Sequence, residues 1–438
     1  MEYIQGKTMK KVILAVALGV ALASPYLIGF KAEEHIKDSY AKVSSNPAFD
    51  IEITRYDRGY LNSTAHIAFT MPVEVEAGVI ETLTFESEHQ VQHGPILWTA
   101  DGLGFGLADS QMIVGLPTDF KQEIINIDDI ASDSLTSFAR TSFGGSTYST
   151  ITIKPTTLEL QDSNLELLAG ELHSTITPEG KVTGTGQWQG MKIIESGVEV
   201  FVIGATKLDV DQTYILGDVF SPTSLGVGTG NFSISHIRVN GETPDASMNI
   251  QDISLVSDSY VEENLLAATV TVKAKSLSIA MQEFSDFNYS MSMDKLNVNV
   301  LSELQKLLVN VQSDDPQQQQ MLMMEIQQQL PKLLADNPRI AIDNLGVTTS
   351  EGDIVSDLLI TIDPQKFDAA NPMSMMFALQ ADAKGSAPSA FFEKLGMQEN
   401  IDALKQQGMV VQDAEQLTFK FSFSDGQALI NGVAIPLG

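Results

Sequence analysis

The chain has 438 residues, enough for about two to three domains, and its hydrophobic fraction of 43% is that of a globular protein rather than a disordered one. Lys and Arg number 26 against 56 Asp and Glu, and the resulting net charge of −30 would repel nucleic acid and anionic lipid surfaces. Cysteine is absent, which excludes thiol nucleophiles, disulfides and thiolate metal sites.

An uncharged apolar run, Val12–Phe30, follows Lys10 and Lys11 near the start of the chain. At about 1.5 Å per residue, a helix of this length crosses most of a bilayer core of about 30 Å. We therefore expect a basic cytoplasmic N-terminus over residues 1–11 and a transmembrane signal anchor over 12–30. By the positive-inside tendency, the main body lies in the periplasm.

A cleaved secretory signal is the alternative, with Ala21-Leu22-Ala23 as its small-residue exit. The retained anchor is favoured because the apolar run continues to Phe30, which a cleaved signal does not need. Pro25, just after the candidate exit, is also unfavourable for cleavage.

A short helix is expected over Lys31–Ser44, and after it the apolar residues repeat with a period of two. This alternation predicts a first hairpin within residues 49–75 and many short strands between Thr147 and Val300, with Asn240-Gly241 as a hairpin turn. Residues 96–145 are less regular, and we expect loops there with a short helix near Ile130–Phe138. The pattern predicts a mainly β protein, either an extended twisted antiparallel sheet or a sandwich.

A helical segment interrupts the strands after residue 300. Asp315-Pro316 offers a cap followed by a proline at the first helical position, and Asn337-Pro338 ends the helix. Strand pairs follow, with further helices at Met373–Ala378 and Ala390–Gln407. The expected organisation is a β-rich region, 31–300, followed by a helical insertion and strand pairs, 301–438, packing on the same body.

Several segments resemble the YdgA-like family of bacterial envelope proteins of unknown function. They are the basic start with its apolar helix, the block Phe49–Leu61, the segment His93–Pro95, the stretch Leu330–Ile342 and the closing turn Asp425–Gly432. The resemblance implies a protein of the inner membrane that faces the periplasm and self-associates. It implies no catalytic residues, because the family has none assigned.

Motifs of catalysis are missing from the sequence, and we predict no catalytic residue, cofactor or metal site. His89 and His93 are four residues apart, but the surrounding alternation indicates a strand, along which four residues span about 13 Å, too far to share one metal. Near this strand, His93 and Trp98 could line a polar site with Arg55 and Arg58. The structural alternative is a turn after His93 and an ion pair of Arg55 or Arg58 with Asp57.

Methionine and leucine gather on one face of the late helices, where they could cover a groove of the sheet. The candidate surface for an apolar ligand or partner consists of Met323, Ile326, Leu330, Leu333, Met375 and Met376. The alternative is ordinary core packing of an amphipathic helix on a sheet.

The leading functional hypothesis is a membrane-anchored periplasmic module without enzymatic activity, which interacts with other envelope proteins or with copies of itself. A binding protein for lipid or another apolar ligand, using a sheet-and-helix groove, is the second hypothesis. A hydrolase is the third, and it is disfavoured because the sequence offers no recognisable nucleophile, metal set or phosphate loop.

Overall fold

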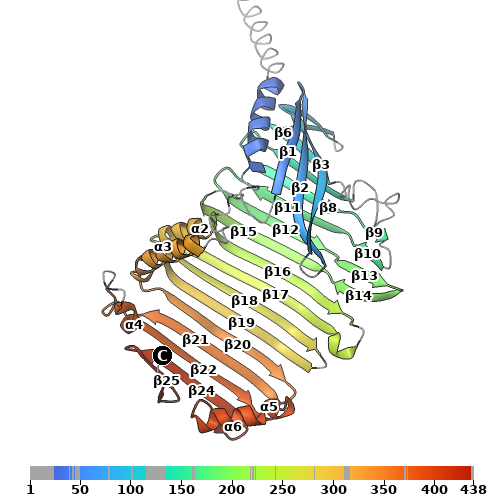
Figure 1. Ribbon diagram of the computed structural model, residues 1–438. Helices are drawn as coiled ribbons and strands as arrows, with labels where there is room; N and C mark the ends of the chain where they lie inside the picture. The colour runs from blue at the N-terminus through green and yellow to red at the C-terminus, as the bar shows by residue number, and fades with distance from the viewer. Residues whose placement is uncertain are drawn as a thin grey trace, which may run out of the picture. The chain divides into compact units, whose positions relative to one another are not determined.

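A computed structural model provides the structure of the chain, whose elements form two compact units (Figure 1). Unit 1 comprises residues 1–191 and 217–224, and unit 2 comprises residues 192–216 and 225–438. The structure describes residues 24–38, 40–41, 44, 50–76, 79–99, 102–114, 134–159, 163–217, 219, 221, 223–241, 243–280, 282–309, 316–368, 371 and 373–435.

Unit 1 begins with a helix that covers residues 24–38 and includes 40, 41 and 44; it is called the N-terminal helix below. Its strands are β1 (Asp50–Arg58), β2 (Asn62–Glu76), β3 (Val79–His93), β4 (Ile96–Thr99), β5 (Gly102–Phe105), β6 (Ala108–Val114), β7 (Leu135–Thr141), β8 (Thr147–Ile153), β9 (Thr156–Glu159), β10 (Ser163–Leu167), β11 (Gly170–Ile176) and β12 (Lys181–Trp188). Antiparallel pairing joins β1, β2, β3, β6, β7, β8, β11 and β12 in that order, while β4 and β5 pair with each other. The expected helix over Lys31–Ser44 is found at its described positions, and the helix extends back at least to Ser24, the first residue that the structure describes.

The N-terminal helix packs on one face of this sheet because side chains in a strand alternate between the two faces. Ile36 of the helix meets Ala65 and Ile67 of β2 and Val91 of β3, and these four residues form a buried core cluster. The core that positions the helix therefore lies over β2 and β3.

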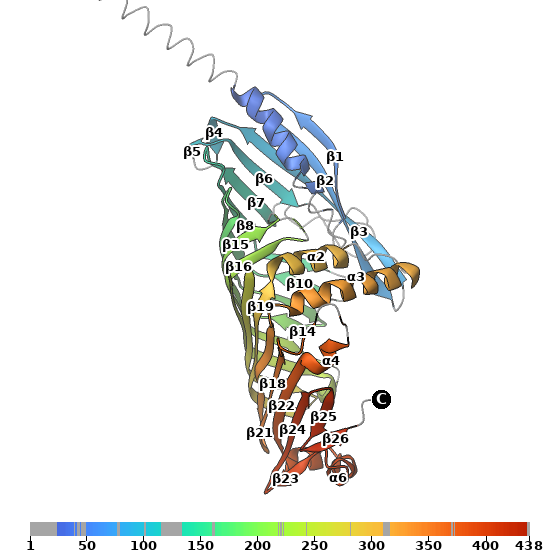
Figure 2. The ribbon, with the colours of Figure 1, turned by 90° about the vertical axis from the view of Figure 1, so that its left-hand side faces the viewer.

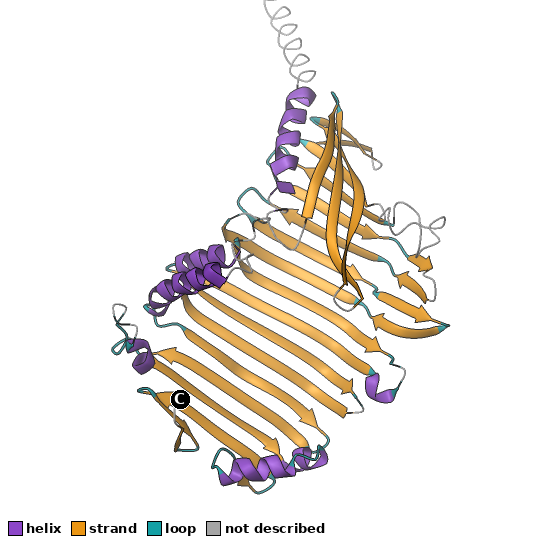
Figure 3. Ribbon diagram, viewed as in Figure 1, coloured by secondary structure: helices purple, strands orange, loops and turns teal. Residues whose placement is uncertain are grey.

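Unit 2 is a series of long antiparallel strands with helices at their ends (Figure 3). Its strands are β14 (Val198–Ile203), β15 (Thr206–Leu216), β16 (Leu225–Val239), β17 (Met248–Glu262), β18 (Leu265–Ile279), β19 (Gln282–Asn297), β20 (Arg339–Thr349), β21 (Gly352–Ile362), β22 (Leu379–Pro388), β23 (Val411–Asp413), β24 (Gln416–Ser424), β25 (Gln427–Ile430) and β26 (Val433–Ile435), and β13 (Met191–Glu195) lies at the boundary of the two units in sequence. Its helices are the 3-10 turn η3 (Pro244–Ala246), α2 (Val298–Val309), α3 (Pro316–Leu334), α4 (Ser374–Ala378), α5 (Ser389–Lys394) and α6 (Gln398–Gln406). The predicted mainly β, antiparallel architecture is thus confirmed in this unit.

One face of unit 2 is apolar across many strands. The register places Phe232, Leu255, Val272, Tyr289 and Leu345 in a single row from β16 to β20. The neighbouring row on the other face is polar, with Ser233, Ser254, Lys273 and Asn288 in corresponding places. We refer to the first as the apolar face of unit 2.

The strands described in unit 2 form one sheet rather than two packed sheets, which decides between the two predicted architectures in favour of the extended sheet. The helical insertion is where it was expected, and α3 begins at Pro316. Strands β19 and β20, on either side of the insertion, pair directly with each other.

Four local predictions need correction. The loops expected over residues 96–145 are mostly strands where the structure describes them, namely β4, β5, β6 and β7. The helix expected near Ile130–Phe138 is wrong where it can be seen, because Leu135–Thr141 is strand β7, paired on both sides; residues 130–133 lie outside the described part. Asn240-Gly241 does not form a two-residue turn, since β17 starts only at Met248 after η3. The helix over Ala390–Gln407 is interrupted at Gly396, whose φ of +71° cannot continue an α-helix.

The predicted membrane segment lies largely outside the described residues, which begin at Ser24. Within the described part of the chain, the helices include none that is long and apolar enough to span a bilayer. Residues 24–30, the end of the predicted segment, are helical and pack on unit 1, where Pro25 and Gly29 are buried.

An ion pair with a buried carboxylate joins β6 to β7. Arg140 donates two hydrogen bonds to Asp109, from Nε at 2.7 Å and from Nη2 at 2.8 Å, and Asp109 is 5% exposed. We expect Asp109→Ala to lower the stability of unit 1 by about 1 to 2 kcal/mol, since the partly buried Arg140 guanidinium loses these two charged acceptors. Asp57→Ala, which removes the exposed partner of Arg55, should cost less than about 1 kcal/mol.

Hydrogen exchange of the β6 and β7 amides in the folded chain measures this difference for unit 1 alone. Equal protection of these amides in the two variants would contradict a stabilising role for the pair.

Candidate functional site

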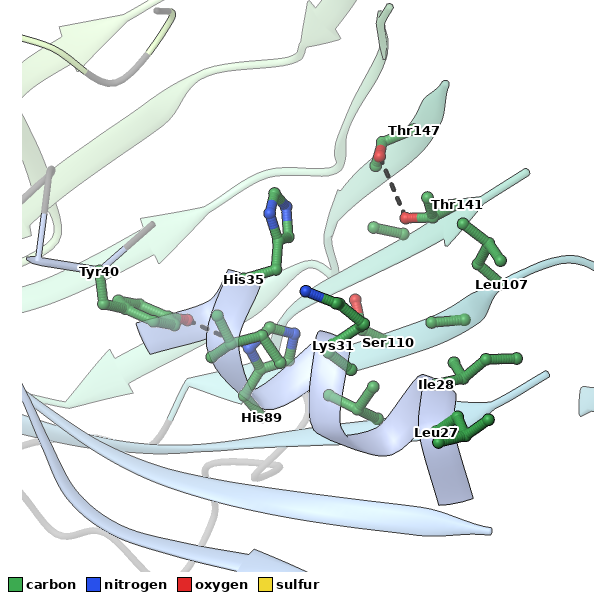
Figure 4. A pocket seen from close by; sticks show the side chains of 15 residues that line it. Leu27, Ile28, Lys31, His35, Tyr40, His89, Leu107, Ser110, Thr141 and Thr147 are labelled. Atoms are coloured by element: carbon green, nitrogen blue, oxygen red, sulfur yellow. Dashed lines mark hydrogen bonds between the residues drawn. The ribbon is translucent and has the colours of Figure 1, made fainter. Parts of the chain in front are cut away.

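An apolar pocket of about 650 Å³ lies in unit 1 between the N-terminal helix and the sheet (Figure 4). It is open on one side. Its lining consists of Leu27, Ile28, Lys31, Ala32, His35, Ile36, Tyr40, His89, Val91, Leu107, Ala108, Ser110, Ala139, Thr141 and Thr147.

The helix side of the pocket is built from residues four positions apart. Ile28, Ala32, Ile36 and Tyr40 recur at this spacing and therefore lie along one stripe of the helix. Tyr40 and Ile36 reach the core over β2 and β3, which fixes this stripe against one side of the sheet.

The sheet side of the pocket is built from small residues. Ala108 of β6 pairs with Thr141 of β7, and Ser110 of β6 pairs with Ala139 of β7. These side chains are short, whereas Val91 of β3 is larger and packs in the core cluster with Ile36 of the helix. The volume of the pocket therefore arises from the change of residue size between β3 and β6–β7.

A neutral polar pair closes one end of the pocket. The Tyr40 hydroxyl lies 3.3 Å from His89 Nδ1 and 3.7 Å from Met112 Sδ. Burial raises the pKa of Tyr40 to about 12 and lowers the pKa of His89 to about 4. Both side chains are therefore uncharged near neutral pH, which suits an apolar environment.

The other lining residues of the helix reach water. Leu27 is 63% exposed, and the Lys31 side chain, also exposed, makes an ion pair of 2.8 Å with Glu34. A ligand in the pocket would thus have its apolar part beside Ile28 and Ala139 and a polar end near Lys31 and His35. This arrangement can hold an elongated apolar molecule.

The four residues of the predicted polar site do not form one site. His93 is 1% exposed: its Nδ1–H donates to the Tyr60 carbonyl at 3.2 Å, and its Nε2, 2.9 Å from Ser63 Oγ, then accepts from that hydroxyl. Burial lowers the pKa of His93. Its ring packs so closely on Gly29 that a side chain there would collide with it, so His93 helps to hold the helix on the sheet.

Trp98, by contrast, is 74% exposed on β4. Arg58 donates to Glu33 of the N-terminal helix at 2.7 Å, and its guanidinium lies 3.6 Å from the centre of the Phe30 ring. Arg55 pairs with Asp57, as the structural alternative expected.

The predicted apolar surface lies in unit 2 and divides into two parts. Leu333 of α3 packs on the cluster of Leu266, Leu296 and Val298, which is the expected core packing of an amphipathic helix. Ile326 and Leu330 are half-buried on the same helix. Met323 is exposed, and so are Met375 and Met376 on α4.

Sequence reasoning missed the pocket of unit 1. Two signals were present: the four-residue spacing of Ile28, Ala32, Ile36 and Tyr40, and the small residues that alternate in β6 and β7. The four-residue spacing was overlooked because the sequence interpretation assigned Ile28 to a membrane segment and the other three residues to a separate helix. The small residues of β6 and β7 do not indicate which element of the fold lies opposite them.

Comparison with known proteins identifies one family. The family model described as "Bacterial protein of unknown function (DUF945)" matches residues 9–438. Curated proteins and solved structures contain no match to the chain.

The lowered pKa of His89 predicts a pH dependence of stability. The unfolded chain takes up a proton at His89 below about pH 6.5, whereas the folded chain does so only near pH 4, so the stability is complete above pH 6.5 and falls as the pH drops towards 4. The loss amounts to roughly 3 kcal/mol. His89→Leu has no imidazole to protonate. Between pH 6.5 and pH 4, its loss of stability should therefore be smaller than that of the wild type by roughly 3 kcal/mol.

Hydrogen exchange of the β3 amides between pH 7 and pH 4.5, corrected for the intrinsic rates, measures the effect in both chains. Parallel curves for the wild type and His89→Leu would show that His89 does not titrate as its burial requires.

Proposed function

The chain belongs to this family of bacterial proteins of unknown function, and we propose that its pocket in unit 1 holds the acyl chain of a lipid. In this proposal the protein is a YdgA-like envelope protein, anchored in the inner membrane by its N-terminal segment, with its main body in the periplasm. Its role is to bind lipid, without catalysing a reaction.

The observation that carries the proposal is the lining of the pocket. A volume of about 650 Å³ is within the usual range of small-molecule sites, roughly 300 to 1,000 Å³. Ile28, Ala32, Val91 and Ala139 offer no hydrogen-bonding side chain, so a polar ligand would lose its hydration there without compensation. An acyl chain has no such hydrogen bonds to lose.

The position of the pocket in the chain supports a lipid over a soluble apolar metabolite. Leu27 and Ile28 line the pocket and continue the apolar run that starts at Val12. A retained anchor would therefore bring the opening of the pocket close to the membrane surface. Since the net charge of −30 disfavours anionic headgroups, the lipid is expected to be zwitterionic or neutral.

The sequence also predicted an interaction module, and unit 2 offers the surface for it. The apolar face of unit 2 and the exposed Met323, Met375 and Met376 could contact a second copy or another envelope protein. Most residues of the apolar face are half-buried, and the exposed methionines lie apart on α3 and α4, whereas the pocket of unit 1 is a defined volume. Lipid binding in unit 1 is therefore the function that the geometry supports best.

Photocrosslinking tests the proposal. The full chain is reconstituted into phosphatidylcholine vesicles that contain a phosphatidylcholine with a diazirine in its acyl chain, and labelled peptides are identified by mass spectrometry. We expect labels in the N-terminal helix and in β6 and β7. Ala139→Trp should fill the pocket and lower this labelling by roughly tenfold, which corresponds to about 1.4 kcal/mol.

Phe138→Trp is the matched control, because Phe138 precedes Ala139 on β7 and lies on the other face of the sheet. It should label like the wild type. Hydrogen exchange of β7 verifies that both variants fold. Equal labelling of a folded Ala139→Trp, or labels confined to the strands of unit 2, would contradict the assignment.

A further inference from the structure

The short hairpin of β4 and β5 has an unusual distribution of side chains. Ile96 pairs with Phe105 and Trp98 pairs with Leu103, so these four large apolar residues share one face of the hairpin. All four are exposed, each by more than half of its surface. In an ordinary hairpin on a protein surface, this outward face would be polar.

The opposite face of the hairpin is fixed to the rest of unit 1. Leu97 is completely buried, and Gly104, its partner across the hairpin, lies against the Arg140 guanidinium. Gly94 donates a backbone hydrogen bond to Leu107 at 2.7 Å, which holds the base of the hairpin. The outward face is therefore held in place rather than free to fold back.

Further exposed aromatic residues lie at the same end of unit 1. Figure 2 shows β4 and β5 at the end where the N-terminal helix begins. Tyr60 and Leu61, in the turn between β1 and β2, are about half exposed, and the Leu61 carbonyl accepts a hydrogen bond from the backbone of His93, next to the hairpin. On the helix itself, Tyr26 and Phe30 are also exposed and stack edge to face, with 5.0 Å between ring centres.

This end of unit 1 combines the features of a membrane-interface surface. Trp and Tyr are enriched where a protein meets the headgroup region, because each has an apolar ring and a polar edge. The segment Gly94–Gly106 carries a single charged residue, Asp101, in a chain with a net charge of −30. In the sequence, the residues just before the described helix, Val12–Ala23, are uncharged and mostly apolar.

We propose that the outward face of the β4–β5 hairpin, with Trp98 at its centre, lies in the interface of a lipid bilayer beside the N-terminal anchor. This inference rests on the membrane anchoring in the proposed function, but not on the occupation of the pocket. The hairpin then orients unit 1 on the membrane. A single anchoring helix leaves unit 1 free to rotate and tilt, whereas a second contact with the bilayer restricts both motions.

Trp98 also borders a hollow on the other face of the sheet, lined by polar residues such as Asn62, Gln92 and Asp109. A sugar stacked on the indole would be the competing occupant. The bilayer is favoured because Ile96, Leu103 and Phe105 share the face of Trp98 and give a sugar nothing to hydrogen-bond.

Depth-dependent quenching of tryptophan fluorescence tests the inference on the full chain. The chain has two tryptophans, and the second, Trp188, is half-buried on β12 and donates to the Leu168 carbonyl at 3.1 Å. The difference between the wild type and Trp98→Phe isolates the signal of Trp98, and Trp98→Phe is mild because the position is exposed. Both chains are reconstituted in phosphatidylcholine vesicles with bromine placed either near the headgroups or near the bilayer centre.

We expect shallow bromine to quench the Trp98 signal roughly twofold more than deep bromine, while the emission of Trp98→Phe, which comes from Trp188, stays unquenched. Replacing both Leu103 and Phe105 by Asn should reduce the quenching of Trp98. A Trp98 signal that neither bromine position quenches would overturn the inference. The same result is expected if Trp98 binds a sugar in water and does not enter the bilayer. Stronger quenching by deep bromine would likewise exclude an interfacial position.

The two proposals fail separately. Loss of Trp98 quenching with retained labelling of β7 leaves lipid binding intact, and loss of β7 labelling with retained quenching leaves the hairpin in the membrane interface.

Discussion

The packing of the N-terminal helix on β2 and β3 is the constraint on which the candidate site depends. Ile36 is buried against Ala65, Ile67 and Val91, and this contact fixes the height of the helix above the sheet. His93 adds a second point, because its two hydrogen bonds to Tyr60 and Ser63 hold its ring against the helix at Gly29. The helix cannot then sink onto β6 and β7, whose small side chains leave the space beneath it unfilled.

The same arrangement links the pocket to the start of the chain. Every lining residue on the helix lies between Leu27 and Tyr40, and the first two, Leu27 and Ile28, belong to the apolar run. In the anchored protein that we propose, the helix passes from the membrane segment to the pocket within about four turns, which couples the two features physically. The exposed hairpin of β4 and β5 lies at the end of unit 1 where the described part of the N-terminal helix starts, so its apolar face and the exposed Tyr26 and Phe30 lie at one end of this unit.

The sequence predicted the fold better than the site. Alternation of apolar and polar residues was sufficient for most strands, as in the apolar face of unit 2, and Asp315-Pro316 correctly marked the start of α3. Leu135–Thr141 misled the prediction because Leu135, Phe138 and Ala139 have helical spacing, and only pairing with strands on both sides makes them β. The pocket could not be predicted, because Ala139 and Ser110 are ordinary small residues until the helix lies opposite them. The sequence analysis placed Trp98 in a polar site together with His93. In the structure Trp98 is exposed, whereas the His93 ring is buried against the helix at Gly29.

Native mass spectrometry of the full chain, extracted from membranes in mild detergent, tests the central claim most directly. Lipid binding in the pocket predicts that the wild type and Phe138→Trp each retain one lipid per chain, and that Ala139→Trp loses it. A wild-type chain without bound lipid, or a folded Ala139→Trp chain that retains as much lipid as the wild type, would contradict the claim.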